Sequence, residues 1–193
     1  MTGFANIAVP PEIARGVLRG DRASHGHFFR LVSPRVLGMA WRMLGNRMAA
    51  EEVVQDVFVR VIENASDVRA VEALVGWVRS ITVNECLMRL RSPWHQRRAA
   101  EEPDDRIDDL DGESRVAGES DIERALTLLQ PETRMVIWLH DVEGYTHREI
   151  GELMGKTASF SKSQLARGYE TLLAHWRKQD GKKIEPGTLA CHS

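Results

Sequence analysis

Residues 146–176 read THREIGELMGKTASFSKSQLARGYETLLAHW, which is the pattern of two amphipathic helices joined by a tight turn. Thr146 is followed three residues later by Glu149, and this spacing predicts a capping box in which each side chain bonds the other residue's backbone N–H. Gly155 stands where a helix end favours a residue with positive φ. A glycine-bearing turn between two helices is typical of a helix-turn-helix, and also of ordinary helical hairpins.

The second helix of this pair, expected to start at Ser159 or Ser161, has an apolar and a polar face. Its apolar positions recur at helical spacing, at Leu165, Tyr169, Leu172, Leu173 and Trp176. The opposite face carries side chains that can donate hydrogen bonds, at Lys162, Ser163, Gln164 and Arg167. Donors near the start of such a helix suit the major groove of DNA, whereas the alternative is a solvated basic face. The rest of the chain decides between these two interpretations.

Charge is unevenly distributed along the chain, although the net charge of its 193 residues is only −2. Residues 79–98 hold five Arg and one Glu, a balance of +4. Residues 101–123 hold eleven acidic and two basic residues, a balance of −9, and residues 146–178 hold six basic residues and three Glu, a balance of +3. Two basic blocks separated by an acidic one indicate two nucleic-acid-facing modules and a spacer, although any single block fits a solvated surface.

Hydrophobic periodicity predicts an all-α fold of two small helical domains joined by an acidic flexible linker, the second domain containing the helix-turn-helix. Apolar residues make up 42% of the chain, enough for a packed core, and alternating β-branched runs are missing. The expected helices are 25–44, continuous or broken at Pro34, then 47–64, 75–91, 120–129 and 133–142. Composition predicts a mobile N-terminal segment 1–24, a first domain 25–98, the linker 99–119, a second domain 120–178 and a mobile tail 179–193.

Little in the sequence points to catalysis or to a metal centre. Cys86 and Cys191 are far apart, and Cys86 falls in an apolar helical pattern that predicts a buried thiol. No Cys or His spacing resembles a zinc site, and no nucleophile–base arrangement accompanies the paired acids Glu51 and Glu52. We therefore expect no enzyme activity, no catalytic residues, no cofactor and no metal. A cytoplasmic location is expected, because neither a leader sequence nor a membrane-spanning run is apparent.

The order of these parts resembles an extracytoplasmic-function (ECF) sigma factor of bacterial RNA polymerase, a branch of the sigma-70 family. In the first domain, MLGN at 43–46, AEEVVQDVF at 50–58, Trp77-Val78 and residues 84–91 resemble the family's region 2. In the second domain, PETRMV at 131–136, VEGYT at 142–146 and KSQL at 162–165 with Arg167 resemble region 4. Both halves in this order are more specific than either alone.

The resemblance implies that the first domain binds both core RNA polymerase and the promoter's minus-ten element. It places the polymerase contacts at Glu51, Glu52, Gln55, Asp56 and Arg60. It places the minus-ten contacts at Ser66, Asp67, Trp77, Arg79, Asn84, Arg89 and Arg91, with the loop 65–74 capturing a flipped base and the arginines meeting phosphates. Bases held outside the stack lower the cost of opening the duplex, so this domain is expected to melt the element. Trp77 is equally explained as a core anchor.

For the second domain the resemblance implies recognition of the minus-thirty-five element in the major groove. The expected contacts are Thr146, Ser161, Lys162, Ser163, Gln164 and Arg167, where Arg pairs best with guanine and Gln with adenine. The family's usual Gly-Thr-Val is replaced by Ser159-Phe160-Ser161, so we expect an upstream element that differs from the family's common one. The linker is expected to occupy the polymerase's RNA channel, and an anti-sigma factor or other regulator is a candidate partner.

The leading prediction is therefore an alternative sigma factor that binds core RNA polymerase and directs initiation at specific promoters. The alternative is a stand-alone helix-turn-helix regulator whose first domain dimerises or binds a ligand. A gel shift on duplex DNA discriminates between them, because a regulator should bind duplex DNA without polymerase and a sigma factor alone should bind it weakly.

Overall fold

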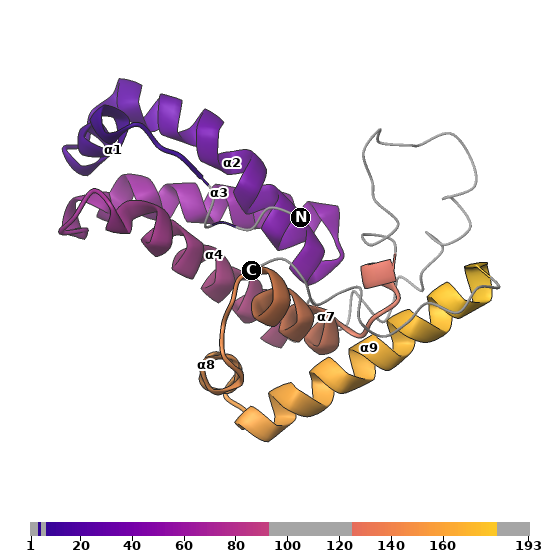
Figure 1. Ribbon diagram of the computed structural model, residues 1–193. Coiled ribbons are helices and arrows are strands. Elements are labelled where there is room, and N and C mark those ends of the chain that lie inside the picture. The colour runs from indigo at the N-terminus through magenta and orange to yellow at the C-terminus, as the bar shows by residue number, and fades with distance from the viewer. Residues whose placement is uncertain (1–3, 5–6, 93–124, 181–193) are drawn as a thin grey trace.

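The computed structural model describes Phe4, residues 7–92 and residues 125–180, and every regular element in these ranges is a helix (Figure 1). The first module holds α1 (Pro11–Leu18), α2 (Arg22–Leu44), α3 (Arg47–Asn64), the 3-10 turn η2 (Ala65–Asp67) and α4 (Ala73–Arg91). The second holds α7 (Pro131–Ile137), the π-helical turn η4 (Trp138–Val142), α8 (His147–Met154) and α9 (Ala158–Asp180). The all-α prediction is confirmed, and the predicted linker 99–119 lies outside the described residues, as does the tail from residue 181.

Helices α2 and α3 form the centre of the first module, and a short turn reverses the chain between them. Gly45 ends α2 with a φ of 68°, and Asn46 caps α3 by accepting a hydrogen bond from the Ala49 backbone N–H at 2.9 Å. Helix α2 continues through Pro34 without a break, so the alternative of two helices divided at this proline is not observed. Apolar side chains before and after the proline, Val32 and Val36, are both fully buried and hold the helix in the core.

The segment 1–24, predicted to be mobile, contains the helix α1 in the part of it that the structure describes. Helix α1 packs against α2, with Ala14 and Val17 buried, and Phe4 is 2% exposed. The first helical turn of α2 is capped by Asp21, whose carboxylate accepts from the Ser24 backbone N–H at 2.8 Å. Helix α1 covers apolar surface that α2 would otherwise expose.

Helix α4 lies against both α2 and α3 and completes the first module. It starts at Ala73, two residues before the predicted start, and ends at Arg91 as expected. Cys86 is fully buried on this helix, which confirms the predicted buried thiol, and burial raises the pKa of the thiol well above its usual range.

The second module is built on the packing of α7 against α9. Pro131 is the first residue of α7, as predicted, and the helix widens into a π-turn at Trp138, which the sequence did not suggest. Gly168 lets α9 approach closely, because a Cβ there would overlap the Ile137 and Thr133 side chains. Apolar contacts from Met135, Val136, Leu139, Ile150 and Leu172 fill the space between the helices.

The two modules also contact each other directly. Helix α2 packs against α7, and α4 contacts α8, so the second module lies beneath α4 in the view of Figure 1. The Arg42 guanidinium of α2 lies over the Trp138 ring, 5.4 Å from its centroid. The conformation is therefore closed, with the helix-turn-helix resting on the first module.

A pair of glycine substitutions tests the close packing of the helix-turn-helix turn. A Cβ on Gly151 of α8 would lie 2.8 Å from the Thr157 backbone carbon, whereas a Cβ on Gly76 of α4 would meet nothing within 4 Å. We expect Gly151→Ala to lower the free energy of unfolding by about 1–3 kcal/mol, because backbone atoms have to move. Gly76→Ala is the matched control and should raise it by about 0.5–1 kcal/mol through helix propensity. Urea unfolding monitored by circular dichroism measures both, and equal stabilisation by the two variants would contradict the described packing.

Candidate nucleic-acid interface

The helix-turn-helix is set by local hydrogen bonds that the sequence predicted. The Thr146 backbone N–H donates to Glu149 Oε2 at 2.8 Å and the Glu149 N–H donates to Thr146 Oγ1 at 3.3 Å, so the capping box is confirmed. These bonds to Thr146 lower the pKa of the Glu149 carboxyl. Gly155 ends α8 with a φ of 64°. Helix α9 starts at Ala158, one residue before the earliest predicted start, because Thr157 Oγ1 accepts the Phe160 N–H at 3.1 Å.

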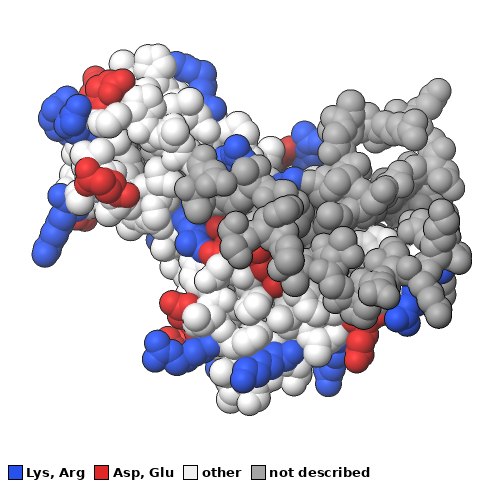
Figure 2. All heavy atoms as spheres, viewed as in Figure 1, with Lys and Arg blue, Asp and Glu red and all other residues white. Residues whose placement is uncertain are grey.

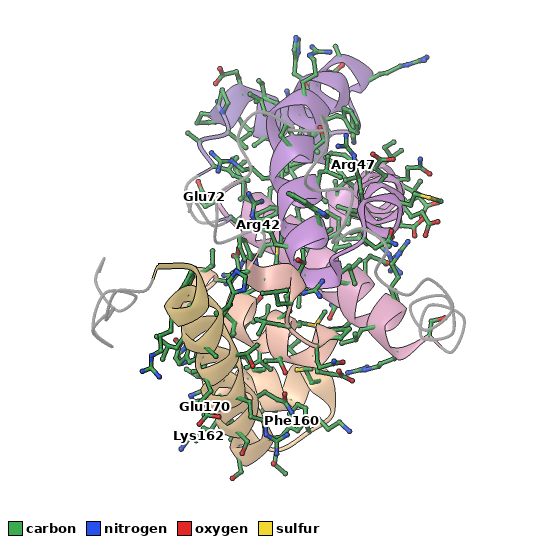
Figure 3. The ribbon with its side chains drawn as sticks, turned by 90° about the vertical axis from the view of Figure 1, so that its right-hand side faces the viewer. Arg42, Arg47, Glu72, Phe160, Lys162 and Glu170 are labelled. Carbon is green, nitrogen blue, oxygen red and sulfur yellow. The ribbon has the colours of Figure 1, made fainter. Side chains whose placement is uncertain are left out.

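The outer face of α9 near its start is exposed and positively charged. Lys162, Ser163 and Arg167 are all exposed, and Ser159 and Ala166 extend the same face. Lys and Arg side chains lie along the lower edge of the molecule in Figure 2, where Figure 1 places α8 and the start of α9. Figure 3 shows Lys162 and Phe160 at the end of the second module that is distant from Arg47 of the first. Among the described residues, this face is therefore exposed to solvent.

Two residues assigned to the DNA-reading face point elsewhere. Ser161 is fully buried, and its hydroxyl oxygen lies 3.0 Å from Nδ1 of His147. Gln164 is half-buried, and its side-chain oxygen accepts the Thr133 hydroxyl at 2.5 Å. Both side chains therefore contact other helices of the second module in this conformation, and their base contacts stay a prediction. Thr146 remains exposed at the start of α8, with its hydroxyl held by Glu149.

The first module presents its minus-ten candidates along α4 and the turn before it. Ser66 and Asp67 lie in η2 and are exposed, whereas Trp77 is half-buried. Asn84 is exposed seven residues after Trp77, so the two lie two turns apart on one side of the helix. Asn84 lines a groove of about 410 Å³ between the modules, together with Ser80 and Val83 of α4 and Tyr145, Glu149, Glu152 and Leu153 of the second module.

The three α4 arginines are all engaged in the closed conformation. Arg79 places its Nε 2.9 Å from Oε2 of Glu143, a carboxylate that is 1% exposed, and also donates to the Glu143 backbone carbonyl. The Arg79 guanidinium lies over the Tyr145 ring, 4.4 Å from its centroid. Arg91 donates to the Leu153 backbone carbonyl at the end of α8. Sequence reasoning missed these contacts, because Glu143 lies 64 residues from Arg79.

Arg89 belongs instead to a charge network within the first module. It pairs with Asp56 of α3 and with Glu85, which lies one turn back on α4 and has a 4% exposed side chain. Arg60 of α3 also forms an ion pair with Glu85, with its Nε 2.7 Å from Glu85 Oε1. Burial lowers the pKa of Arg89, but its bonds to Asp56 and Glu85 outweigh this and raise it.

The residues predicted to contact polymerase fall into two groups, those that pair with α4 and those that face outward from α3. Asp56 and Arg60 tie α3 to α4 in this network, and Glu52 lies 3.8 Å from Arg89 at its edge. Glu51 and Gln55 are exposed on the outer side of α3, and Glu51 bonds only the neighbouring Arg47 at 3.1 Å.

Neither a metal site nor a membrane helix emerges from these residues. Across residues 7–92 and 125–180, no three His, Cys, Asp or Glu side chains gather where they could hold a metal ion. None of the helices in those ranges has the length and apolar character needed to span a bilayer.

Comparison with known proteins matches both modules to one family. Residues 28–96 match the family model for Sigma-70 region 2, and residues 119–172 match the model for Sigma-70, region 4. The RNA polymerase sigma factor CarQ of Myxococcus xanthus is 31% identical over 159 residues, which cover 79% of this chain and 89% of CarQ. The ECF RNA polymerase sigma factor SigE of Mycolicibacterium smegmatis is 29% identical over 177 residues, covering 86% of this chain and 68% of SigE.

A solved structure shares the fold. The sigma factor RpoE of Bartonella quintana, determined in complex with the anti-sigma factor NepR, superposes with a TM-score of 0.51 at 20% identity, covering 79% of this chain and 96% of RpoE. The paired helical modules, the order of the matched regions and the relatives agree with one another. The chain belongs to the ECF branch of the sigma-70 family and is an alternative sigma factor, which directs RNA polymerase in transcription initiation.

Proposed function

We propose that the two modules bind separate elements of one promoter, and that the outer face of α9 reads the upstream, minus-thirty-five element. The observation that carries this proposal is the division of α9 into two sides. Lys162, Ser163 and Arg167 are exposed, whereas Ser161 and Gln164 are held inside. Because Gln164 is taken up by Thr133, base discrimination rests on Arg167, Lys162 and Ser163, with Arg and Lys best suited to guanine.

In the first module, we propose that α3 binds core RNA polymerase through its outer side and that α4 with η2 melts the minus-ten element. Exposed Glu51 and Gln55 supply polar contacts to polymerase, while Asp56 and Arg60 keep α3 in register with α4. Ser66 and Asp67 are exposed in η2, Trp77 and Asn84 lie two turns apart on one side of α4, and these residues would hold an unpaired base. Holding a base outside the stack favours the open duplex.

The closed conformation implies a separation step before the first module binds DNA. Arg79 and Arg91, which would meet phosphates, are bonded to Glu143 and Leu153 of the second module. The Glu143 carboxylate also accepts the Phe4 backbone N–H at 3.4 Å, so it links three parts of the chain. We propose that polymerase binding separates the modules and frees both arginines. A regulator of the kind that RpoE of Bartonella quintana binds could use the same groove to keep them together or apart.

Charge removal at Glu143 tests this separation step. Glu143→Gln takes away the charge that pairs with Arg79, so the modules should separate more often and the free protein should bind single-stranded minus-ten DNA more tightly. Small-angle scattering should show a larger radius of gyration than for the wild type. Glu152→Gln changes an exposed carboxylate on the wall of the same groove and is the matched control. Unchanged dimensions and DNA affinity in Glu143→Gln would show that this pair does not hold the modules closed.

A charge reversal on α3 tests the polymerase contact. Glu51→Arg breaks only a surface pair with Arg47 and should leave the fold intact, since such pairs contribute about 0–1 kcal/mol. We expect it to weaken binding to core polymerase by about tenfold or more, through unfavourable charge across the interface. Asp56→Arg is a poorer test, because it also removes a partner of Arg89. The control is Glu12→Arg, at an exposed position of α1; an equal effect of both reversals would remove Glu51 from the interface.

Removal of Arg167 tests the upstream contact. Arg167→Ala, measured in polymerase holoenzyme on a promoter recovered by mapping start sites after overexpression, should weaken binding. It should also reduce the salt slope by about 1, as expected for one lost phosphate or base-edge contact. Arg177→Ala, about 15 Å further along α9, is the control and should leave the slope unchanged. If the two variants gave the same slope as the wild type, Arg167 would not contact DNA.

A further inference from the structure

A polar cluster lies between α9 and the segment formed by η4 and α8, and it includes none of the residues proposed to read DNA. Ser161 of α9 is fully buried with its hydroxyl 3.0 Å from Nδ1 of His147, the first residue of α8. The His147 ring stacks on the ring of His140 in η4, with centroids 4.5 Å apart and planes 19° from parallel. An apolar contact would be the usual choice on the buried side of such a helix.

The same cluster contacts α9 at a second residue, Tyr169. His140 Nδ1 lies 2.8 Å from Asp141 Oδ1, and the other oxygen of Asp141 accepts the Tyr169 hydroxyl at 2.8 Å. Ser161 and Tyr169 are eight residues apart on α9, which corresponds to about 12 Å along the helix. Between them, the helix rests on α7 through Gly168. The contact at Ser161 therefore fixes the end of α9 that carries Lys162, Ser163 and Arg167.

We propose that His140 and His147, together with Asp141, are positioning residues that set the rotation of the base-reading face of α9 by holding Ser161 and Tyr169. A single attachment would let the helix pivot, whereas two attachments on its inner side fix both rotation and tilt. Because bidentate contacts with base edges depend on alignment, the cluster should govern discrimination between DNA sequences more than total affinity. The inference rests on the proposal that α9 reads the upstream element.

The charges around the histidines make this positioning depend on pH. The groups that face His147 are His140 and Asp141 from η4 and Lys162 from α9, while Glu149 on its own helix is held by Thr146. Burial lowers the pKa of His147 below its usual 6.5, His140 and Lys162 lower it further, and Asp141 partly opposes them. The neutral ring is therefore favoured in the folded state. The arrangement is most stable above the pKa of His147 and is weakened as the pH falls and the His147 ring has to take up a proton.

The test measures sequence discrimination by polymerase holoenzyme containing the full chain. The specific probe is a duplex enriched from a random-sequence library by wild-type holoenzyme, and the reference probe is the same duplex with its bases scrambled. The ratio of the two affinities is compared at about pH 7.5 and about pH 5.5, a range in which histidine titrates. Discrimination by the wild type should fall as the pH drops, while affinity for the scrambled duplex should not fall, because added positive charge favours phosphate binding.

Three variants separate positioning from simple stability. His147→Ala should reduce discrimination by about tenfold at the higher pH, the scale of one lost hydrogen bond and stacking contact. His147→Asn keeps an amide where Nδ1 lies, so it should restore much of the discrimination and flatten its pH dependence. Tyr169→Phe removes only the bond to Asp141 and should give an intermediate loss. Circular dichroism confirms that each variant remains helical.

The possible results are distinct. If the wild type discriminates but His147→Ala and Tyr169→Phe discriminate equally well, the cluster has no positioning role and only this inference fails. A pH profile for His147→Asn that matches the wild type would also overturn it. If wild-type holoenzyme enriches no upstream sequence at all, the proposed reading by α9 fails, and the inference that rests on it fails too.

Discussion

The close approach of α9 to α7 at Gly168 is the constraint on which the rest of the structure depends. A side chain there would overlap Ile137 and Thr133, so the glycine lets Thr133 come within hydrogen-bonding distance of Gln164. Once Gln164 and Ser161 are turned toward the other helices, Lys162, Ser163 and Arg167 are among the polar residues near the start of α9 that stay exposed. The surface proposed to face DNA is therefore determined by the side chains that α9 buries as much as by the donors that it exposes.

Ion pairs within the first module and the ion pair between the two modules have different effects on the structure. The Glu85 carboxylate is almost fully buried between Arg60 and Arg89, and removing either arginine would leave a buried charge incompletely paired. This network keeps α3 and α4 in fixed register, so that the helix proposed to bind polymerase and the helix proposed to bind DNA move as one body. The Arg79–Glu143 ion pair instead joins the two modules, and it occupies the guanidinium group that we propose binds a DNA phosphate. The cost of removing the two charges from water offsets much of the attraction between them, so a buried ion pair of this kind adds little net stability. Its effect is to favour one relative position of the two modules.

The parts of the structure that depend on neighbouring residues could be predicted from the sequence, and the parts that depend on distant ones could not. The capping box of Thr146 and Glu149, the left-handed glycines Gly45 and Gly155, and the bounds of α3 all follow from local hydrogen bonds and periodicity. The inward direction of Ser161 and Gln164 depends on His147 and Thr133, which periodicity does not reveal. The docking of α1, the π-turn at Trp138 and the pairing of Arg79 with Glu143 likewise depend on tertiary packing. The proposed roles in promoter binding come from the family resemblance, because contacts within the chain do not indicate which residues bind DNA.

The most direct test of the account is a photo-crosslinking experiment on transcription initiation complexes. A crosslinking amino acid at Ser163, on α9, or at Asp67, in η2, is introduced into the full chain and assembled with core polymerase on promoter DNA. The account predicts that crosslinks from position 163 fall on the upstream element and those from position 67 on the minus-ten element of the same promoter, both requiring polymerase. Crosslinks from both positions to a single DNA site, or equal crosslinking without polymerase, would contradict it.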